Sequence, residues 1–210
     1  MASTDAEGGS GLELERLVFF SDAVFAIAIT LLVIDLKLPP AADLGSERAA
    51  WQALAETLPR FLGFVISFLV IGAYWVGHHR MFRHIVRYND SLLWRNLLLL
   101  MWIAFLPFPT SVFSEPGRGQ MPLVLYAASL GFAGISSAWL WRYAVHHGLV
   151  ATGTQRETIK YLTLRAVTIP FVCLIAIGIS FLNPILARWS FCLIPFVQRI
   201  AIRLGARRRF

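Results

Sequence analysis

Six long apolar segments constrain the fold of this sequence more than any other feature. A membrane-spanning helix needs about 20 predominantly apolar residues, and six stretches approach that length. They cover residues 17–38, 58–77, 92–112, 122–143, 161–182 and 185–202. Their apolar residues do not alternate with polar ones, so helices rather than barrel strands are expected. The sequence therefore predicts an all-α, polytopic membrane protein with six transmembrane helices and one repeat per chain.

The composition agrees with this class and excludes an ordinary soluble domain. The chain has 57% hydrophobic and 15% charged residues, whereas a soluble domain has about 45–50% apolar and about 25% charged residues. Polar, glycine-rich residues 1–15 are expected to form a mobile N-terminal tail. We expect a transmembrane domain over residues 16–205 and a basic C-terminal tail over residues 206–210.

The basic residues predict which side of the membrane each loop occupies. If the N-terminus is cytoplasmic, fourteen of the nineteen Lys and Arg residues lie on the cytoplasmic side. The five outer ones are Lys37, Arg48, Arg60, Arg118 and Arg188. We therefore expect a protein of the cell membrane with both termini in the cytoplasm. The asymmetry explains the net charge of +7 without nucleic acid as a partner, and it places the basic tail against lipid headgroups.

The first apolar segment contains a carboxylate, which a membrane helix rarely tolerates. A carboxylate at the centre of a span costs about 2.5–3.5 kcal/mol, so Asp22 needs either a partner or a function. One alternative is a structural clamp, in which it pairs with Arg16, Trp75 or His78 near the cytoplasmic face. The other is a protonatable group in transport.

Helical geometry gathers an aliphatic stripe on another face of the same segment. At about 100° per residue, Leu31 and Ile34 lie within about 40° of Ile27, and Thr30 lies beside them. Asp22 lies about 140° from Ile27. Ile29, about 200° from Ile27, is expected to face lipid. By itself, an aliphatic stripe in a membrane helix indicates lipid contact or helix packing.

Three motifs follow one another along the first half of the chain. The first is Arg16-x-x-x-Phe20-Ser21-Asp22, followed by AIAITLL at 26–32. The second is YWVGHH at 74–79, and the third runs from LLWRNL at 92–97 to FLPFPT at 105–110. In this order they resemble the first three helices of the bacterial relatives of the endolysosomal potassium channel, the transmembrane protein 175 family.

The resemblance implies a potassium-permeable cation channel that assembles as a homotetramer. In this family the pore is lined by the first helix, and the T-V-G-Y-G filter of ordinary potassium channels is missing, as it is from this sequence. Carried onto this chain, the resemblance implies constriction layers at Ile27, Leu31 and Ile34, with Thr30 as the pore-lining polar residue. It implies structural roles for the motif residues, which are Arg16, Phe20, Ser21, Asp22, Trp75 and His78.

Two other functional classes remain as alternatives. A proton- or cation-coupled secondary transporter would use Asp22 and usually has an internal repeat, which we do not find within the six segments. A membrane enzyme would need a catalytic motif. The sequence has no nucleotide-binding loop, nucleophile elbow or zinc-protease motif, so we expect no enzymatic activity and no cofactor.

Two smaller groups of residues lie near the ends of the spans. His78, His79 and His84 are not spaced as metal ligands, because adjacent histidines point to different faces of a helix, so no metal is expected. Asp35 lies near the outer end of the first segment. It either attracts cations to the mouth of a pore or pairs with Lys37 or Arg60.

Overall fold

The structure is a computed structural model that describes residues 2–37, 46–115, 119–183 and 186–187. The helices are α1 (Ala2–Leu31), the 3-10 helix η1 (Leu32–Asp35), α2 (Glu47–Phe82), α3 (Asp90–Phe105), α4 (Pro107–Ser114), α5 (Met121–His146) and α6 (Arg156–Ser180). The described residues contain no β-strand, only an isolated bridge between Ile85 and Val150. The predicted all-α class is therefore confirmed.

Five stretches are long and apolar enough to cross a membrane. They are Gly11–Asp35, Glu47–Phe82, Asp90–Ser114, Met121–His146 and Arg156–Ser180. Each contains most or all of one of the first five predicted segments. Of the sixth, 185–202, only residues 186–187 are described, and the basic tail 206–210 lies outside the described residues.

The first helix is longer at its N-terminus than the sequence predicts. Residues 1–15 are expected to be a mobile tail, but α1 begins at Ala2. Once a spanning helix exists, each added residue extends it without a new nucleation cost, so the helix continues into the polar segment. At its other end, regular α-helix stops at Leu31 and a turn of 3-10 helix reaches Asp35, before the predicted end at residue 38.

The second helix also begins well before residue 58, where the second predicted apolar segment starts. The Ser46 side chain accepts a hydrogen bond from the Ala49 backbone N–H at 3.2 Å, which caps the first turn. The helix then continues through Pro59 to Phe82. The third span is interrupted, because α3 ends at Phe105 and α4 begins at Pro107, which has no N–H to continue the helix.

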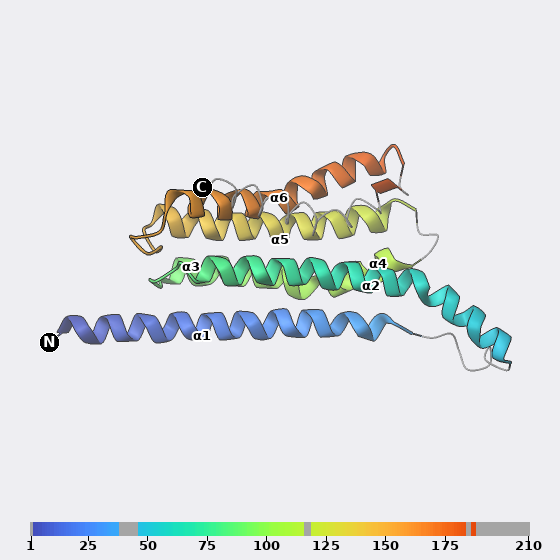
Figure 1. Ribbon diagram of the computed structural model, residues 1–210, viewed down its shortest axis with the longest axis horizontal. Coiled ribbons are helices and arrows are strands. Elements are labelled where there is room, and N and C mark those ends of the chain that lie inside the picture. Colours follow the sequence, from blue (N-terminus) through green and yellow to red (C-terminus); the bar gives the residue numbers. More distant parts are fainter. Residues whose placement is uncertain (1, 38–45, 116–118, 184–185, 188–210) are drawn as a thin grey trace, which may run out of the picture.

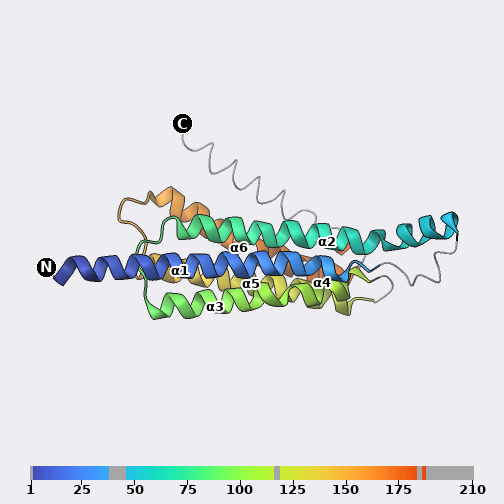
Figure 2. The same cartoon turned by 90° about the horizontal axis from the view of Figure 1, so that it is seen from below.

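The helices form three layers (Figure 1). One layer is α1 alone, the middle layer is α2 with α3 and α4, and the third is α5 with α6. Seen from the side of α1, this helix runs between α2 and the α3–α4 pair (Figure 2). We call the end with the first residues of α1 and the loops 83–89 and 147–155 the proximal end, and the end with η1 and α4 the distal end.

The contact between α5 and α6 depends on a small residue. A Cβ placed on Gly134 would lie 2.5 Å from Cδ of Pro170 and 3.0 Å from the Tyr74 hydroxyl. The first distance is shorter than real Cβ contacts and the second is at the tight end of their range, so the absence of a side chain at Gly134 permits this approach of Pro170. The closely packed α5 and α6 support the middle layer, and α1 packs against the other side of that layer.

Candidate functional site

The two faces of α1 have opposite environments. Leu17, Phe25, Ala28 and Leu32 are buried against the other helices. On the opposite face Ile27 is 57% exposed, Leu31 40% and Ile34 61%. The predicted stripe therefore faces away from the chain's own core. An apolar face of this kind needs lipid, a second copy or a pore to complete its surroundings.

Thr30 is the hydroxyl beside this stripe, and it is exposed. Its Oγ1 donates a hydrogen bond to the Ile27 carbonyl at 2.9 Å. Because the hydroxyl proton is used within the helix, the lone pairs of the oxygen remain for an acceptor role on the exposed face. The site thus combines three aliphatic side chains with one oxygen acceptor.

Asp22 points toward α2 rather than along the stripe. The indole Nε1–H of Trp75 donates a hydrogen bond to Asp22 Oδ1 at 2.8 Å. Trp75 is one of the three partners expected from the sequence, and it is the one that the structure shows. The bond fixes α1 to α2, which is the geometry that the clamp interpretation requires.

Behind the stripe, a fully buried hydrogen-bonded chain connects three helices. Asn96 Nδ2 of α3 donates to Ser21 Oγ of α1 at 2.8 Å, and Ser21 Oγ donates to the Leu17 carbonyl at 2.7 Å. His78 Nε2 of α2 lies 2.8 Å from Asn96 Oδ1, and because that oxygen only accepts, Nε2 carries the proton. His78 Nδ1 has no hydrogen-bond partner within the described part of the chain.

His78 therefore bonds to Asn96 and not to Asp22. Sequence reasoning places Asn96 within a motif but gives it no role. The only signal in the sequence for such a role is that Asn96 is a lone amide in the apolar segment that follows Ser91. A buried amide in a membrane helix needs hydrogen-bond partners.

The R-x-x-x-F-S-D motif divides between the two faces of α1. Ser21 and Asp22 turn toward α2 and α3, whereas Arg16 and Phe20 are exposed on the side of the stripe. An Arg16–Asp22 pair does not form, because six residues correspond to about 240° around a helix and the two side chains diverge. Among the described residues, Arg16 has no polar partner.

Ile29 corrects one expectation about this helix. It is predicted to face lipid, but it is only partly exposed and packs against the hydrophobic core. The reason is that α1 packs against α2 on one side and against α3 and α4 on the other (Figure 2). The neighbouring helices therefore cover more of its circumference than one packing stripe.

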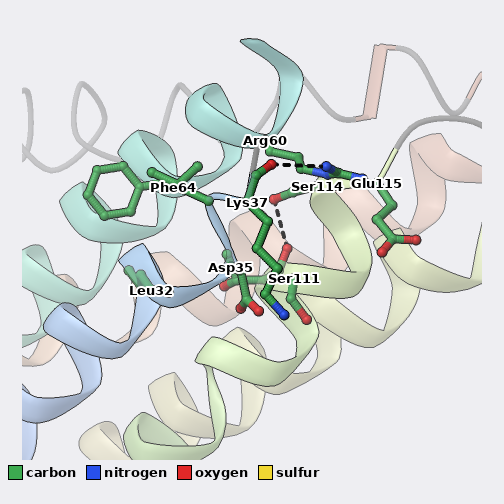
Figure 3. A pocket seen from close by; sticks show the side chains of 10 residues that line it. Leu32, Asp35, Lys37, Arg60, Phe64, Ser111, Ser114 and Glu115 are labelled. Atoms are coloured by element: carbon green, nitrogen blue, oxygen red, sulfur yellow. Dashed lines mark hydrogen bonds between the residues drawn. The ribbon is translucent and has the colours of Figure 1, made fainter. Parts of the chain in front are cut away.

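A cavity of about 170 Å³ lies at the distal end between η1, α2 and α4 (Figure 3). Its lining residues are Leu32, Asp35, Leu36, Lys37, Arg60, Phe64, Thr110, Ser111, Ser114 and Glu115. Arg60 Nη1 donates to the Lys37 carbonyl at 3.5 Å, and Asp35 forms no ion pair within the described residues. Of the two alternatives for Asp35, the pairing with Lys37 or Arg60 is therefore not seen among these residues. Two cations and two carboxylates balance each other, so the lining favours neither sign of ligand.

The histidines of the proximal end do not form a metal site. His79 stacks on Trp75 with ring centroids 5.8 Å apart, while His78 points into the core. In residues 2–37, 46–115, 119–183 and 186–187, no group of three or more His, Cys, Asp or Glu side chains is placed to hold a metal ion.

Comparison with known proteins connects this geometry to a family. Residues 16–107 match the family model described as endosomal/lysosomal potassium channel TMEM175. A potassium channel of Chryseobacterium sp. (strain P1-3) is 38% identical over 121 residues, which are 58% of this chain and 59% of that protein. The match thus spans about three fifths of that relative's length.

Two longer matches involve Chamaesiphon minutus. A potassium channel of that organism is 33% identical over 175 residues, which are 81% of this chain and 86% of that protein. The crystal structure of a lysosomal potassium-selective channel TMEM175 homolog from the same organism has a TM-score of 0.76 at 29% identity. The superposition covers 94% of this chain and 99% of that one. With its five candidate membrane helices, the chain is a multi-pass membrane protein and belongs to the TMEM175 family.

Proposed function

We propose that this chain is a subunit of a potassium-permeable cation channel whose pore is lined by α1. The observation that carries the proposal is the exposed stripe of Ile27, Leu31 and Ile34 on a helix whose opposite face is buried. The relatives named potassium channels in bacteria support the same activity. A channel needs no catalytic group, and neither an enzyme nor a cofactor is part of the proposal.

The assembly that we propose is a homotetramer in the cell membrane. One chain offers one candidate pore face, and cyclic copies close a ring around an axis. Ile27, Leu31 and Ile34 then form stacked aliphatic rings. The first two are separated by about 6 Å along the axis, and the third lies about 6 Å further on, because the 3-10 turn that carries Ile34 rises about 2 Å per residue. An aliphatic ring offers no ligand to replace the water around a potassium ion, so conduction depends on wetting of this neck.

We propose that the proximal end is cytoplasmic. Arg80, Arg83 and Arg87 lie there, and cytoplasmic loops are enriched in Lys and Arg. Potassium ions would pass between this side and the distal end, and membrane lipids would surround the side of the assembly opposite α1, where α5 and α6 lie. The six-helix count and the single repeat per chain belong to the same proposal.

Polar contacts between α1 and its neighbours fix the direction in which the stripe faces. The Asp22–Trp75 bond holds α1 to α2, and the Ser21–Asn96–His78 chain holds it to α3 and α2. A rotation of α1 by one residue, about 100°, would replace Ile27 at the pore with an alanine. A coupled transporter that protonates Asp22 has no support from the relatives, and this carboxylate is engaged by an indole.

Purified protein in proteoliposomes tests the proposal directly. We expect potassium uptake under a potassium gradient, smaller uptake of sodium under a matched gradient, and a tetramer in a mass measurement of the detergent complex. A monomer as the only species, or no flux of either ion, would contradict it.

A further inference from the structure

The N-terminal part of α2 extends beyond the rest of the bundle. Arg60 bonds to the Lys37 carbonyl just after η1, and Gly63 lies against Ser114, the last residue of α4. Residues 47–59, which we call the α2 extension, therefore lie past the distal ends of α1 and α4. They are 13 residues of helix, or about 20 Å. Figures 1 and 2 show this segment projecting past the other helices.

The length of α2 places most of this extension outside the lipid. Arg60 and Arg80 are separated by about 30 Å along the helix, which equals the thickness of the hydrocarbon core. Trp51 lies about 13 Å beyond Arg60, whereas each headgroup layer adds only about 5–7 Å. If α2 continues outward from Arg60, its first two turns therefore lie beyond the headgroup layer, and lipid does not cover them.

The extension nevertheless carries a continuous apolar seam. Trp51, Leu54, Leu58 and Phe61 alternate in steps of three and four residues, and they are between 47% and 67% exposed. Val65 and Phe68 continue the same spacing into the spanning part. Apolar residues at this period form the contact seam of a coiled coil. The exposed polar side chains of Gln52 and Glu56 lie on a different face.

The direction of the extension indicates what covers the seam. Pro59 lies inside α2, and proline is a regular cause of helix bending. Figure 1 shows the extension bending toward the side of the molecule on which α1 lies. If α1 faces a common axis, as in the proposed function on which this step rests, the extensions of several copies converge over the distal mouth.

We propose that the seam of the α2 extension packs against the α2 extension of a second copy of this chain. The copies form a helical collar around the distal mouth, outside the membrane. Trp51, Leu54 and Leu58 lose contact with water in the collar, while Gln52 and Glu56 remain on its outer surface. An exposed apolar row of this size outside lipid is otherwise unfavourable for a folded protein.

Spin labels in the full-length, reconstituted protein test the collar. In a background in which Cys173 and Cys192 are replaced by alanine, a label is introduced at Leu54→Cys or Leu58→Cys and, as matched controls, at Gln52→Cys or Glu56→Cys. We expect low accessibility of the seam labels both to oxygen, which reports lipid, and to a nickel chelate, which reports water. The control labels should be accessible to the chelate.

Each other outcome overturns the collar. High oxygen accessibility at the seam means that lipid covers it, and high chelate accessibility means that nothing does. The accessibility of each label is interpreted together with a mass measurement of the same labelled sample. A tetramer with water-accessible seam labels refutes the collar and leaves the channel intact, whereas a monomer with potassium flux absent refutes the proposed function itself.

Introducing negative charge into the seam gives a second, independent measurement. The double variant Leu54→Glu, Leu58→Glu should raise the dissociation constant of the tetramer by about tenfold or more, since apolar anchors dominate interface energies. The matched variant Gln52→Glu should leave it unchanged. A double variant that assembles as tightly as the parent would overturn the proposal.

Discussion

Ile27 on α1 and Ile135 on α5 are almost equally exposed, at 57% and 56%, but their surroundings differ. Ile135 lies in a row with Phe132 and Trp139, which are large and also exposed, and Phe132 stacks on Trp102 at 4.8 Å. Ile27 lies beside the hydroxyl of Thr30 and in front of a buried polar network. Exposure alone therefore does not distinguish the proposed pore face from a lipid face, and the comparison depends on the neighbouring side chains.

The largest effect expected from this comparison is on ion flux. Ile27→Trp should abolish potassium flux because four indoles fill the narrowest ring, and Ile27→Asn should raise flux and weaken the preference for potassium because an amide wets the neck. The measurement is uptake into proteoliposomes with potassium or sodium.

The matched controls are Ile135→Trp and Ile135→Asn. They change a side chain of the same type and exposure in the third layer, so flux per tetramer should stay at the parental level. If the Ile27 variants conduct like the parent while the Ile135 variants do not, the pore face lies on a different helix.

The next effect concerns the buried chain behind α1. Asn96→Ala removes the partner of His78 Nε2 and one partner of Ser21 Oγ. A buried polar group left without a partner costs about 1–3 kcal/mol. We expect a lower melting temperature of the detergent complex and altered flux, because α1 loses its fixed azimuth.

A bond behind α5 provides the control for this prediction. Trp141 Nε1 donates to Thr163 Oγ1 at 3.0 Å, so Thr163→Ala should lower the melting temperature without changing the flux of the assembled tetramer. Equal changes in flux for both variants would show that the network behind α1 has no particular connection to the pore.

A smaller effect is expected at the bond between α1 and α2. Asp22→Ala removes the acceptor of the Trp75 indole, and a hydrogen bond to a charged group contributes about 1.5–3 kcal/mol. The Asp22–Trp75 bond is only half-buried, so the loss of stability should be toward the lower end of this range. Native mass measurement of the tetramer yield and its melting temperature would show the decrease.

Asp22→Asn is the corresponding control, since it keeps an oxygen acceptor for the indole without the charge. It should recover most of the tetramer yield. A stable and fully assembled Asp22→Ala protein with changed ion selectivity would instead place this carboxylate in the ion pathway.

The comparison between faces also shows what the sequence can predict. The angle between Ile27 and Leu31 follows from residue spacing alone, because it is a property of one α-helix. Ile34 lies in the 3-10 turn η1, which the spacing does not predict, and it is exposed like the other two. Trp75 as a partner of Asp22 follows from its depth in the neighbouring span. The role of Asn96 depends on the register between α1 and α3, which no single-helix pattern contains.

Two differences between expectation and structure have separate physical causes. Ile29 is predicted to face lipid because the apolar residues of α1 continue around the helix, and only the positions of α2 and α3–α4 show that it packs on the core. There, tertiary contacts outweigh the local hydrophobic pattern. The second predicted span begins at residue 58 because hydropathy falls before it, whereas the Ser46 cap, a local signal, starts α2 at Glu47.

The smallest effect expected is at Thr30, where one atom distinguishes the pore face from a purely aliphatic one. Thr30→Val keeps the shape of the side chain and removes the only oxygen that it offers to the exposed side. One hydrogen-bond acceptor contributes about 0.5–1.5 kcal/mol, which corresponds to about a two- to tenfold change in rate. Potassium flux should therefore fall by no more than about tenfold, with a smaller change for sodium.

Thr168 on α6 is partly buried and, like Thr30, donates a hydrogen bond to a carbonyl of its own helix. Its Oγ1 donates to the Leu164 carbonyl at 2.8 Å, four residues back rather than three, so Thr168→Val loses a comparable bond and one hydroxyl oxygen in the third layer. Flux should not change, because no ion approaches that face. A parental flux for Thr30→Val together with a reduced one for Thr168→Val would mean that the hydroxyl beside Ile27 does not face permeating ions, even if the aliphatic rings do.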